Sequence, residues 1–243
     1  MVYILLKILN IIFYFLLLKN GVFGENINDA NGFINGINNR EEIFSLQNDI
    51  SIDINDVLKI QSKRVKISGK SKNTLLHFKN NDSINLSFFE DCKEIEFKDI
   101  SITGNFKFNK NINIKFDNVL FNGYFISENS NDYSKDSTMQ LLNSEFHLIN
   151  QYHGYEIYNY QLTIKYTKIY GNDITNLSLM SIINKKNDIK KIIINNSYFT
   201  GNYCNSAVNI QYGEIRCTYS KFEKFYNGKD FNRYISNIYI FFI

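Results

Sequence analysis

The side chains that could do acid–base chemistry are scattered along this sequence. Enzymes that hydrolyse polysaccharides hold two carboxylates a few ångströms apart, so that one donates a proton while the other activates water or attacks. The sequence has no Asp-Asp pair and no Asn-Thr-Asp, and it lacks the His and Arg-Ile-Lys elements that accompany them in pectin-type hydrolases. His153-Gly154 is the nearest fragment of such a motif. We therefore predict no catalytic residue.

Candidate metal ligands are equally sparse. A calcium-dependent lyase needs a cluster of Asp and Glu together with a base, but arginine is scarce and Arg216 is expected to point into solvent. His77, His147 and His153 do not have the spacing of metal ligands, either with one another or with the cysteines. The sequence therefore predicts no metal and no cofactor.

Tyrosines supply a candidate binding cluster. The segment QYHGYEIYNY carries Tyr152, Tyr155, Tyr158 and Tyr160. Exposed aromatic rings can stack on sugar rings, and the tyrosine hydroxyl adds a hydrogen bond. Tyr152 and Tyr155 are therefore candidates for glycan stacking. The alternative is that half of these rings pack inward, as the alternation of a strand requires.

The sequence also suggests covalent modifications. Asn-X-Ser sequons predict N-glycosylation where they face solvent in a secreted chain, and they occur at Asn81, Asn85, Asn176 and Asn195. Three cysteines are too few for a disulfide framework. Cys204 and Cys217 are closest along the chain and form the candidate pair; alternatively, Cys217 is a small buried hydrophobe.

Residues 1–24 differ from the rest of the chain. An apolar run from Val2 to Leu18 holds Lys7, and Lys19 and the small-residue stretch Gly21–Gly24 follow. This pattern predicts a secretory signal peptide, with a retained signal anchor as the alternative. We expect a secreted or cell-surface protein that meets a membrane only through this segment, if it stays uncleaved. Without its two lysines the net charge falls from +3 to +1, a balance that argues against nucleic acid as a partner.

A repeated pattern of strands must position any functional side chain. Six segments share an apolar-x-apolar-x start, a bend residue and a second short apolar stretch, and they begin at Ile95, Ile114, Met139, Leu162, Ile192 and Ile215. The alternation predicts strands, and the mean period of about 24 residues predicts a solenoid. The predicted fold is all-β, a right-handed parallel β-helix.

The bend position of the repeat favours left-handed backbone. It is occupied in the six copies by Asp99, Asn118, Asn143, Tyr166, Asn196 and Tyr219. Asn and Asp suit such bends because their short side chains bond the local backbone. Stacked Asn side chains are expected to form an amide ladder from coil to coil.

The repeat also sets the domain limits. Residues 25–58 are predicted to be an N-terminal cap, in which Asn39 and Glu42 form a capping box for a helix over residues 40–47. Residues 59–230 form the β-helix, with polar loops at 128–137 and 184–188. The pattern stops after Asp230, so residues 231–243 are predicted to be an irregular or truncated tail.

Four segments carry a resemblance to a known family: IEFKDISITGN, IKFDNVLF, QYHGYEIYNYQLTI and SKFEKFYNGKD. Over roughly residues 40–230 the chain resembles the secreted β-helix proteins of anaerobic gut fungi, many of which look like the N-terminal portions of scaffoldins, the surface proteins proposed to hold cellulosomal enzymes. The resemblance implies a non-catalytic scaffold and carries over no catalytic residue.

Three functions are thus open. We expect a non-catalytic, secreted or cell-surface β-helix scaffold whose partners are polysaccharides or other secreted proteins. The alternatives are a carbohydrate-active enzyme of the pectin lyase-like class and a glycan-binding adhesin.

Overall fold

The computed structural model describes residues 25–80, 83–89, 91–109, 112–127, 137–149, 153–172, 178–202, 204, 206–224 and 238–241. For Glu25 and residues 238–241 it describes the backbone alone. The predicted signal peptide and three predicted site residues, Asn81, Tyr152 and Asn176, lie outside the described residues.

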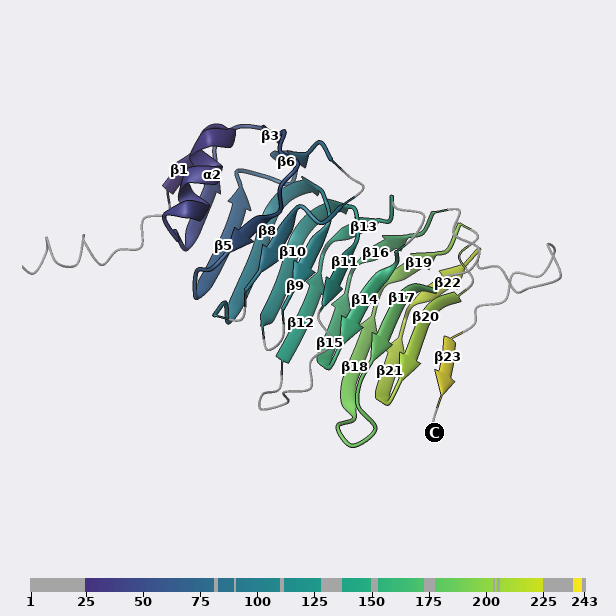
Figure 1. The fold of residues 1–243 in the computed structure, drawn as a ribbon. Helices are drawn as coiled ribbons and strands as arrows, with labels where there is room; N and C mark the ends of the chain where they lie inside the picture. The colour runs from purple at the N-terminus through teal and green to yellow at the C-terminus, as the bar shows by residue number, and fades with distance from the viewer. Residues whose placement is uncertain are drawn as a thin grey trace, which may run out of the picture.

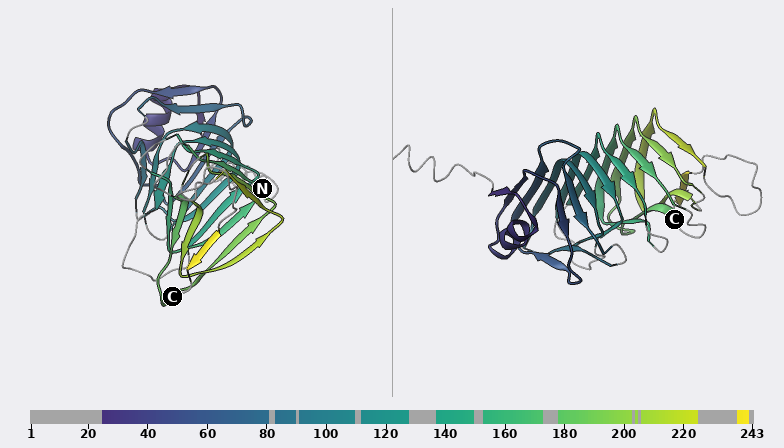
Figure 2. Two further views of the ribbon diagram at one scale, coloured as in Figure 1. Left: turned by 90° about the vertical axis from the view of Figure 1, so that its right-hand side faces the viewer. Right: turned by 90° about the horizontal axis from the view of Figure 1, so that it is seen from above.

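The described chain winds into a parallel β-solenoid of about eight turns with a period of about 23 residues, as the repeat predicts. Its strands follow one another along one axis, from α2 at one end to β23 at the other (Figures 1 and 2). Each coil passes along three faces, and each strand pairs in parallel with the equivalent strands of the adjacent coils.

The first and second faces together form a 15-stranded sheet. The first face comprises β1 (Glu25–Ile27), β2 (Ile43–Leu46), β5 (Arg64–Gly69), β8 (Glu94–Thr103), β10 (Asn113–Asn122), β12 (Ser137–Leu142), β15 (Tyr160–Lys165), β18 (Lys190–Asn195) and β21 (Gly213–Thr218). The second face comprises β3 (Ile50–Ile52), β6 (Leu75–Phe78), the later halves of β8 and β10, β13 (Glu145–His147), β16 (Lys168–Tyr170), β19 (Tyr198–Thr200) and β22 (Lys221–Glu223).

The third face is an 8-stranded sheet. Its members are β4 (Leu58–Ile60), β7 (Leu86–Phe88), β9 (Phe106–Phe108), β11 (Phe125–Ser127), β14 (Tyr155–Tyr158), β17 (Ser178–Ile183), β20 (Ser206–Gln211) and β23 (Ile238–Phe241).

The register of the coils is the one that the repeat predicts. Ile95 pairs with Ile114, Ile114 with Met139, and the column continues through Leu162 and Ile192. Because the period of a strand is two, every second side chain of these strands points into the core. The interior is filled by stacked aliphatic and phenylalanine side chains whose positions repeat from coil to coil.

The bends between the first and second faces are left-handed in all six copies. The six predicted bend residues have φ between 48° and 57°. The predicted amide ladder forms only in part: Asn118 Nδ2 donates to Asp99 Oδ1 in the preceding coil at 2.7 Å, whereas the amide of Asn196 donates to Asn195 in its own coil. An outward amide at a solvated corner can also bond to side chains of its own coil. Stacking of the bend residues therefore does not impose one hydrogen-bond pattern on all coils.

A ladder of hydroxyl groups lies one residue after the bends instead. Its members are Ser144, Thr167, Ser197 and Ser220. Each hydroxyl accepts a hydrogen bond from a backbone N–H of the preceding coil and donates to the carbonyl two residues earlier in its own coil. Ser144, Thr167 and Ser197 are buried, so these bonds satisfy backbone groups that water does not reach.

The N-terminal end carries the predicted helix at a different place. Helix α2 spans Ala30–Asn38, begins after Asp29, whose carboxylate accepts from Gly32 N at 2.8 Å, and buries Phe33 and Ile37. The prediction of a helix over residues 40–47 is wrong, because Ile43–Leu46 alternates half-buried and buried side chains and pairs with β1 and β5. In the part of the chain that the structure describes, no helix has the length and apolar character needed to cross a membrane.

Strand pairing extends beyond residues 59–230 at both ends. Strands β2 and β3 of the predicted cap already pair with β5 and β6, so the stacked sheets begin before residue 59. At the other end, Ile238–Phe241 of the predicted tail forms β23, which pairs with β20 at the register Val208 to Ile238. This pairing satisfies the backbone edge that β20 would otherwise expose.

Candidate functional site

An aromatic surface covers the C-terminal half of the second face. It consists of the outward side chains of β13, β16, β19 and β22 together with three bend residues that precede these strands. We call it the tyrosine surface, and its members are Glu145, His147, Tyr166, Lys168, Tyr170, Asn196, Tyr198, Tyr219, Lys221 and Glu223.

The short strands of the second face explain the arrangement. In each strand the middle residue is buried, as Phe199 and Phe222 are, so that its two neighbours point outward. The parallel register then aligns the residues on either side of the buried one in two columns: one runs Glu145, Lys168, Tyr198, Lys221, and the other runs His147, Tyr170, Thr200, Glu223. Thr200 is the exception in the second column, because it is itself buried. Adjacent members of a column are about 4.8 Å apart along the solenoid axis.

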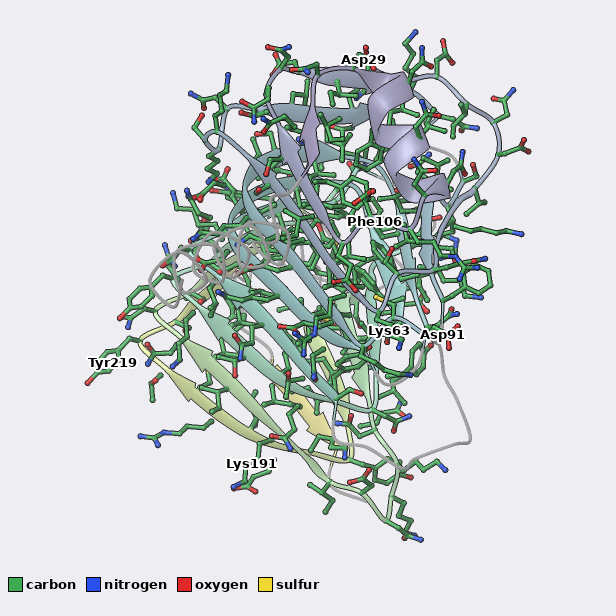
Figure 3. The ribbon with its side chains drawn as sticks, turned by 90° about the vertical axis from the view of Figure 1, so that its left-hand side faces the viewer. Asp29, Lys63, Asp91, Phe106, Lys191 and Tyr219 are labelled. Atoms are coloured by element: carbon green, nitrogen blue, oxygen red, sulfur yellow. The ribbon has the colours of Figure 1, made fainter. Side chains whose placement is uncertain are left out.

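A third column runs along the corner formed by the bends. Tyr166 and Tyr219 are 62% and 87% exposed, and the exposed Asn196 lies between them. Tyr219 projects from the outer edge of the ribbon (Figure 3). Both tyrosines have φ of 52°, in the left-handed region that costs a residue with a side chain about 1–2 kcal/mol. Strained backbone of this kind concentrates at ligand contacts.

Tyr198, Lys221 and Glu223 form a hydrogen-bonded cluster across two coils. The Tyr198 hydroxyl donates to Glu223 Oε1, Lys221 Nζ lies 2.6 Å from Glu223 Oε2, and the same Nζ lies 5.7 Å from the centroid of the Tyr198 ring. The bonds from Lys221 and Tyr198 hold the pKa of Glu223 below its usual value, and the bond to Glu223 raises the pKa of Tyr198. The cluster therefore holds the Tyr198 ring in a fixed orientation.

A second cluster involves His147. Its Nε2 lies 2.7 Å from Glu145 Oε1, and its ring stacks on Tyr170 with centroids 4.5 Å apart and an interplanar angle of 16°. The Tyr170 ring meets Tyr198 edge-on, with centroids 6.1 Å apart. Three aromatic rings thus contact one another across three successive coils, and each end of the row is held by a carboxylate.

The chemistry available to this surface is mainly that of binding. Rings offer flat apolar area, while the amide of Asn196 and the Lys168 ammonium offer hydrogen bonds. Glu145 and Glu223 are three coils apart, about 14 Å along the axis, which exceeds the carboxylate separations of glycosidases. Within the described ranges, no three His, Cys, Asp or Glu side chains gather as metal ligands would.

The structure contradicts the prediction that Tyr155 stacks on glycans. Its side chain is 0% exposed and packs against Phe125 and Phe146, with ring centroids 5.0 Å and 5.9 Å away. Burial raises the pKa of Tyr155 well above its usual value. The alternation of β14 turns Tyr155 and Ile157 inward, so Tyr155 is part of the core.

Of the sequons that the structure describes, one asparagine is buried and one lies on the outer side of a strand. Asn85 is 5% exposed; its Oδ1 accepts from Asn105 N at 2.7 Å and its Nδ2 donates to Asn80 O, so the folded chain does not present it as a glycan acceptor. Asn195 lies on the outer side of β18, as predicted, and its Nδ2 donates to Thr218 Oγ1 at 2.5 Å. Its glycosylation stays a prediction.

The predicted pair of cysteines is not joined. Cys204 and Cys217 form no disulfide bond with each other. Cys204 is buried at the corner after the second face, where its Sγ donates to Asn172 O, whereas Cys217 pairs with Ile194 on the first face. The half-buried Cys217 extends an apolar column, which is the alternative that the sequence left open.

The tyrosine surface was not recognised from the sequence as a site, although its signal was present. Tyr166 and Tyr219 occupy the bend position, where Asn or Asp stands in the other four copies. A bulky aromatic residue at a left-handed position departs from the turn chemistry of the repeat. That departure is the feature by which the surface could have been found.

Comparison with known proteins adds little to this geometry. No family model matches the sequence, and no curated protein matches it. Among solved structures, the chain is similar to that of a PL6 family alginate lyase, AlyGC, with a TM-score of 0.47 and 10% sequence identity. The similarity covers 82% of this chain and 38% of that one, so the chain spans well under half of the lyase. A likeness at this level supports no conclusion about this chain.

Proposed function

We propose that this chain is a non-catalytic scaffold, secreted or held at a cell surface, in the manner of the scaffoldin-like β-helix proteins of anaerobic gut fungi. The observation that supports this role is the fixed grid of outward side chains. Columns of the second face repeat at the spacing of the coils, and their acids are bonded to neighbouring His, Lys and Tyr side chains.

Rigidity is the property that a scaffold requires, and the interior supplies it. Phenylalanine rings contact from coil to coil, as Phe97 does with Phe116 and Phe116 with Phe146. The hydroxyl ladder ties the corner of four coils to the backbone. The partners of this scaffold are polysaccharides or other secreted proteins, and Asn195 is its outward candidate for a glycan.

Turnover assays test the non-catalytic role. The purified chain is incubated with pectin, alginate and xylan, and new reducing ends and unsaturated sugars are measured. We expect no product above a heat-denatured control. Product that disappears in Glu145→Gln or Glu223→Gln, with the fold intact by circular dichroism, would overturn the proposed function.

A carbohydrate-active enzyme is the second candidate, and one pair of residues favours it. Glu145 holds the half-exposed imidazole of His147 by a 2.7 Å contact, and a carboxylate that orients a histidine is the usual support of a general base. If this pair were catalytic, turnover on one of these polymers would be lost in both His147→Gln and Glu145→Gln.

A further inference from the structure

We propose that the tyrosine surface binds a neutral polysaccharide whose chain runs across the coils, parallel to the solenoid axis, with sugar rings resting on Tyr166 and Tyr219. The inference deepens the proposed interaction role, on which it rests, by naming the partner and the residues that contact it.

The exposed rings have a spacing that suits a sugar chain. Tyr166 and Tyr219 occupy the same column two coils apart, and the coil spacing makes this separation about 10 Å along the axis. That separation is comparable to the length of a disaccharide unit in an extended chain. A polymer lying along the column would therefore meet one ring at every second sugar, with the amide of Asn196 opposite the sugar between them.

Tyr166 and Tyr219 occupy left-handed backbone that disfavours a bulky side chain. Asn118, Asn143 and Asn196 fill the same left-handed position with a side chain suited to it. Tyr166 and Tyr219 accept the same backbone while leaving most of each ring in water. Scattered exposed hydrophobic residues need no explanation, but these two rings occupy equivalent left-handed positions and are 62% and 87% exposed. A bound sugar face would supply the missing contact.

Aromatic and hydrogen-bonding side chains flank the two exposed rings. The adjacent columns continue the aromatic area with Tyr170 and Tyr198, both half-buried and held by neighbours. Lys168 is exposed between Glu145 and Tyr198 in its column. Its ammonium can donate to sugar hydroxyls.

The charge of the surface selects the class of polysaccharide. Lys168 and Lys221 are balanced by Glu145 and Glu223, and Lys221 is already paired with Glu223. A uronic acid polymer would place a carboxylate at each sugar and would require an excess of basic side chains, as phosphate polymers do. The surface offers none, which favours an uncharged glycan.

Affinity electrophoresis tests the inference with the full chain. Gels contain xylan, glucomannan or hydroxyethylcellulose as neutral polymers, and alginate or polygalacturonate as acidic ones. The variants are Tyr166→Asn, Tyr219→Asn and the double substitution, which place at these positions the residue that other coils carry. The matched control is Tyr212→Asn, because Tyr212 has φ of 57° but lies at the corner between the third and first faces.

We expect at least one neutral polymer to retard the unsubstituted chain. Each single substitution should raise the dissociation constant about threefold to tenfold, and the double substitution should raise it further. A change of this size corresponds to the usual free energy of one aromatic contact. The Tyr212→Asn variant should migrate as the unsubstituted chain does.

Three results would overturn the inference: no retardation by any neutral polymer, retardation by the acidic polymers alone, or retardation that the double substitution leaves unchanged. Each is distinct from failure of the scaffold role, which would appear as enzymatic product in the turnover assays. A chain that cleaves a neutral polymer and loses affinity in the double variant would keep the binding surface and lose the scaffold role.

Discussion

The rings of Phe97 and Phe116 stack one coil apart, with centroids 4.7 Å apart and an interplanar angle of 21°. Both side chains are fully buried at paired positions of β8 and β10. The distance between the rings is therefore close to the distance between the strands that carry them. This relationship repeats through the interior and makes the core a stack of equivalent layers.

Truncation within this stack should be strongly destabilising. We expect Phe116→Ala to lower the free energy of unfolding by about 3–5 kcal/mol, because it removes a ring that also contacts Phe125 and Phe146 and leaves a cavity. Phe116→Leu keeps most of the volume and should cost distinctly less. Urea denaturation followed by circular dichroism measures both, and equal losses for the two variants would contradict the layered packing.

The hydroxyl ladder gives a second prediction. Thr167 is 1% exposed; its Oγ1 donates to Lys165 O at 2.9 Å and is approached by Ser144 N at 3.4 Å. Thr167→Val should lower the stability by about 1–3 kcal/mol, because a buried N–H loses its acceptor. Val119 occupies the position equivalent to Thr167 in the coil before Ser144, so this column already accommodates a valine side chain. Thr163→Val on the outer side of β15 is the control, and a similar loss in both would show that the ladder contributes nothing specific.

Because Tyr219 lies in left-handed backbone, we expect its substitution to affect the stability of the chain and its affinity for glycan differently. Tyr219→Asn replaces an 87% exposed ring at φ 52° with a residue that tolerates the left-handed backbone. The free energy of unfolding should stay the same or rise by up to about 1 kcal/mol, although affinity for glycan falls. Chemical denaturation is the measurement. A clear loss of stability would mean that the ring is held by packing rather than kept for a ligand.

Stability should depend on pH through Glu96. Its carboxylate lies 3.1 Å from the ammonium groups of both Lys66 and Lys115 in the adjacent coils. Burial acts to raise the pKa of Glu96, but the hydrogen bonds from the two lysines outweigh it and lower the pKa below its usual 4.5. A lowered pKa in the folded state means that the stabilisation is present above the unfolded pKa and is lost as the pH falls through the folded one.

The test of this pair of contacts is the variant Glu96→Gln. We expect it to be less stable than the unsubstituted chain by about 1 kcal/mol at pH 7, and the difference should shrink toward pH 3. Glu94→Gln, at a more exposed position whose carboxylate lies 3.6 Å from Arg64 Nε, is the control and should change little. A difference for Glu96→Gln that persists unchanged at pH 3 would point to packing rather than charge.

The right-handed sense of the coil and the secreted location stay predictions. The signal peptide, the sequons at Asn81 and Asn176, and the candidate Tyr152 lie outside the described residues. Mass mapping of glycopeptides from a secretory host would test Asn195, and we expect no glycan on folded chains at the buried Asn85.

The sequence by itself determined the fold, the coil register and the bends of this protein. Alternation of side chains is a local property with a period of two, and a repeat of about 24 residues aligns it from coil to coil. That is why the columns from Ile95 onward and the left-handed residues from Asp99 to Tyr219 could be predicted. The Asn and Asp residues of the bend favour a turn through hydrogen bonds to the local backbone, so no distant contact is required to specify it.

Only the tertiary structure decided which side chains face solvent at the corners and which residues of different coils meet. Tyr219 is left exposed at its corner, whereas Tyr155, within β14, is enclosed by Phe125 and Phe146 of other strands. Asn85 is enclosed because Asn105 of the next coil bonds to it, and Cys204 and Cys217 lie on different faces although they are near in sequence. Exposure at a corner depends on the lengths and paths of the neighbouring coils, which no single segment contains.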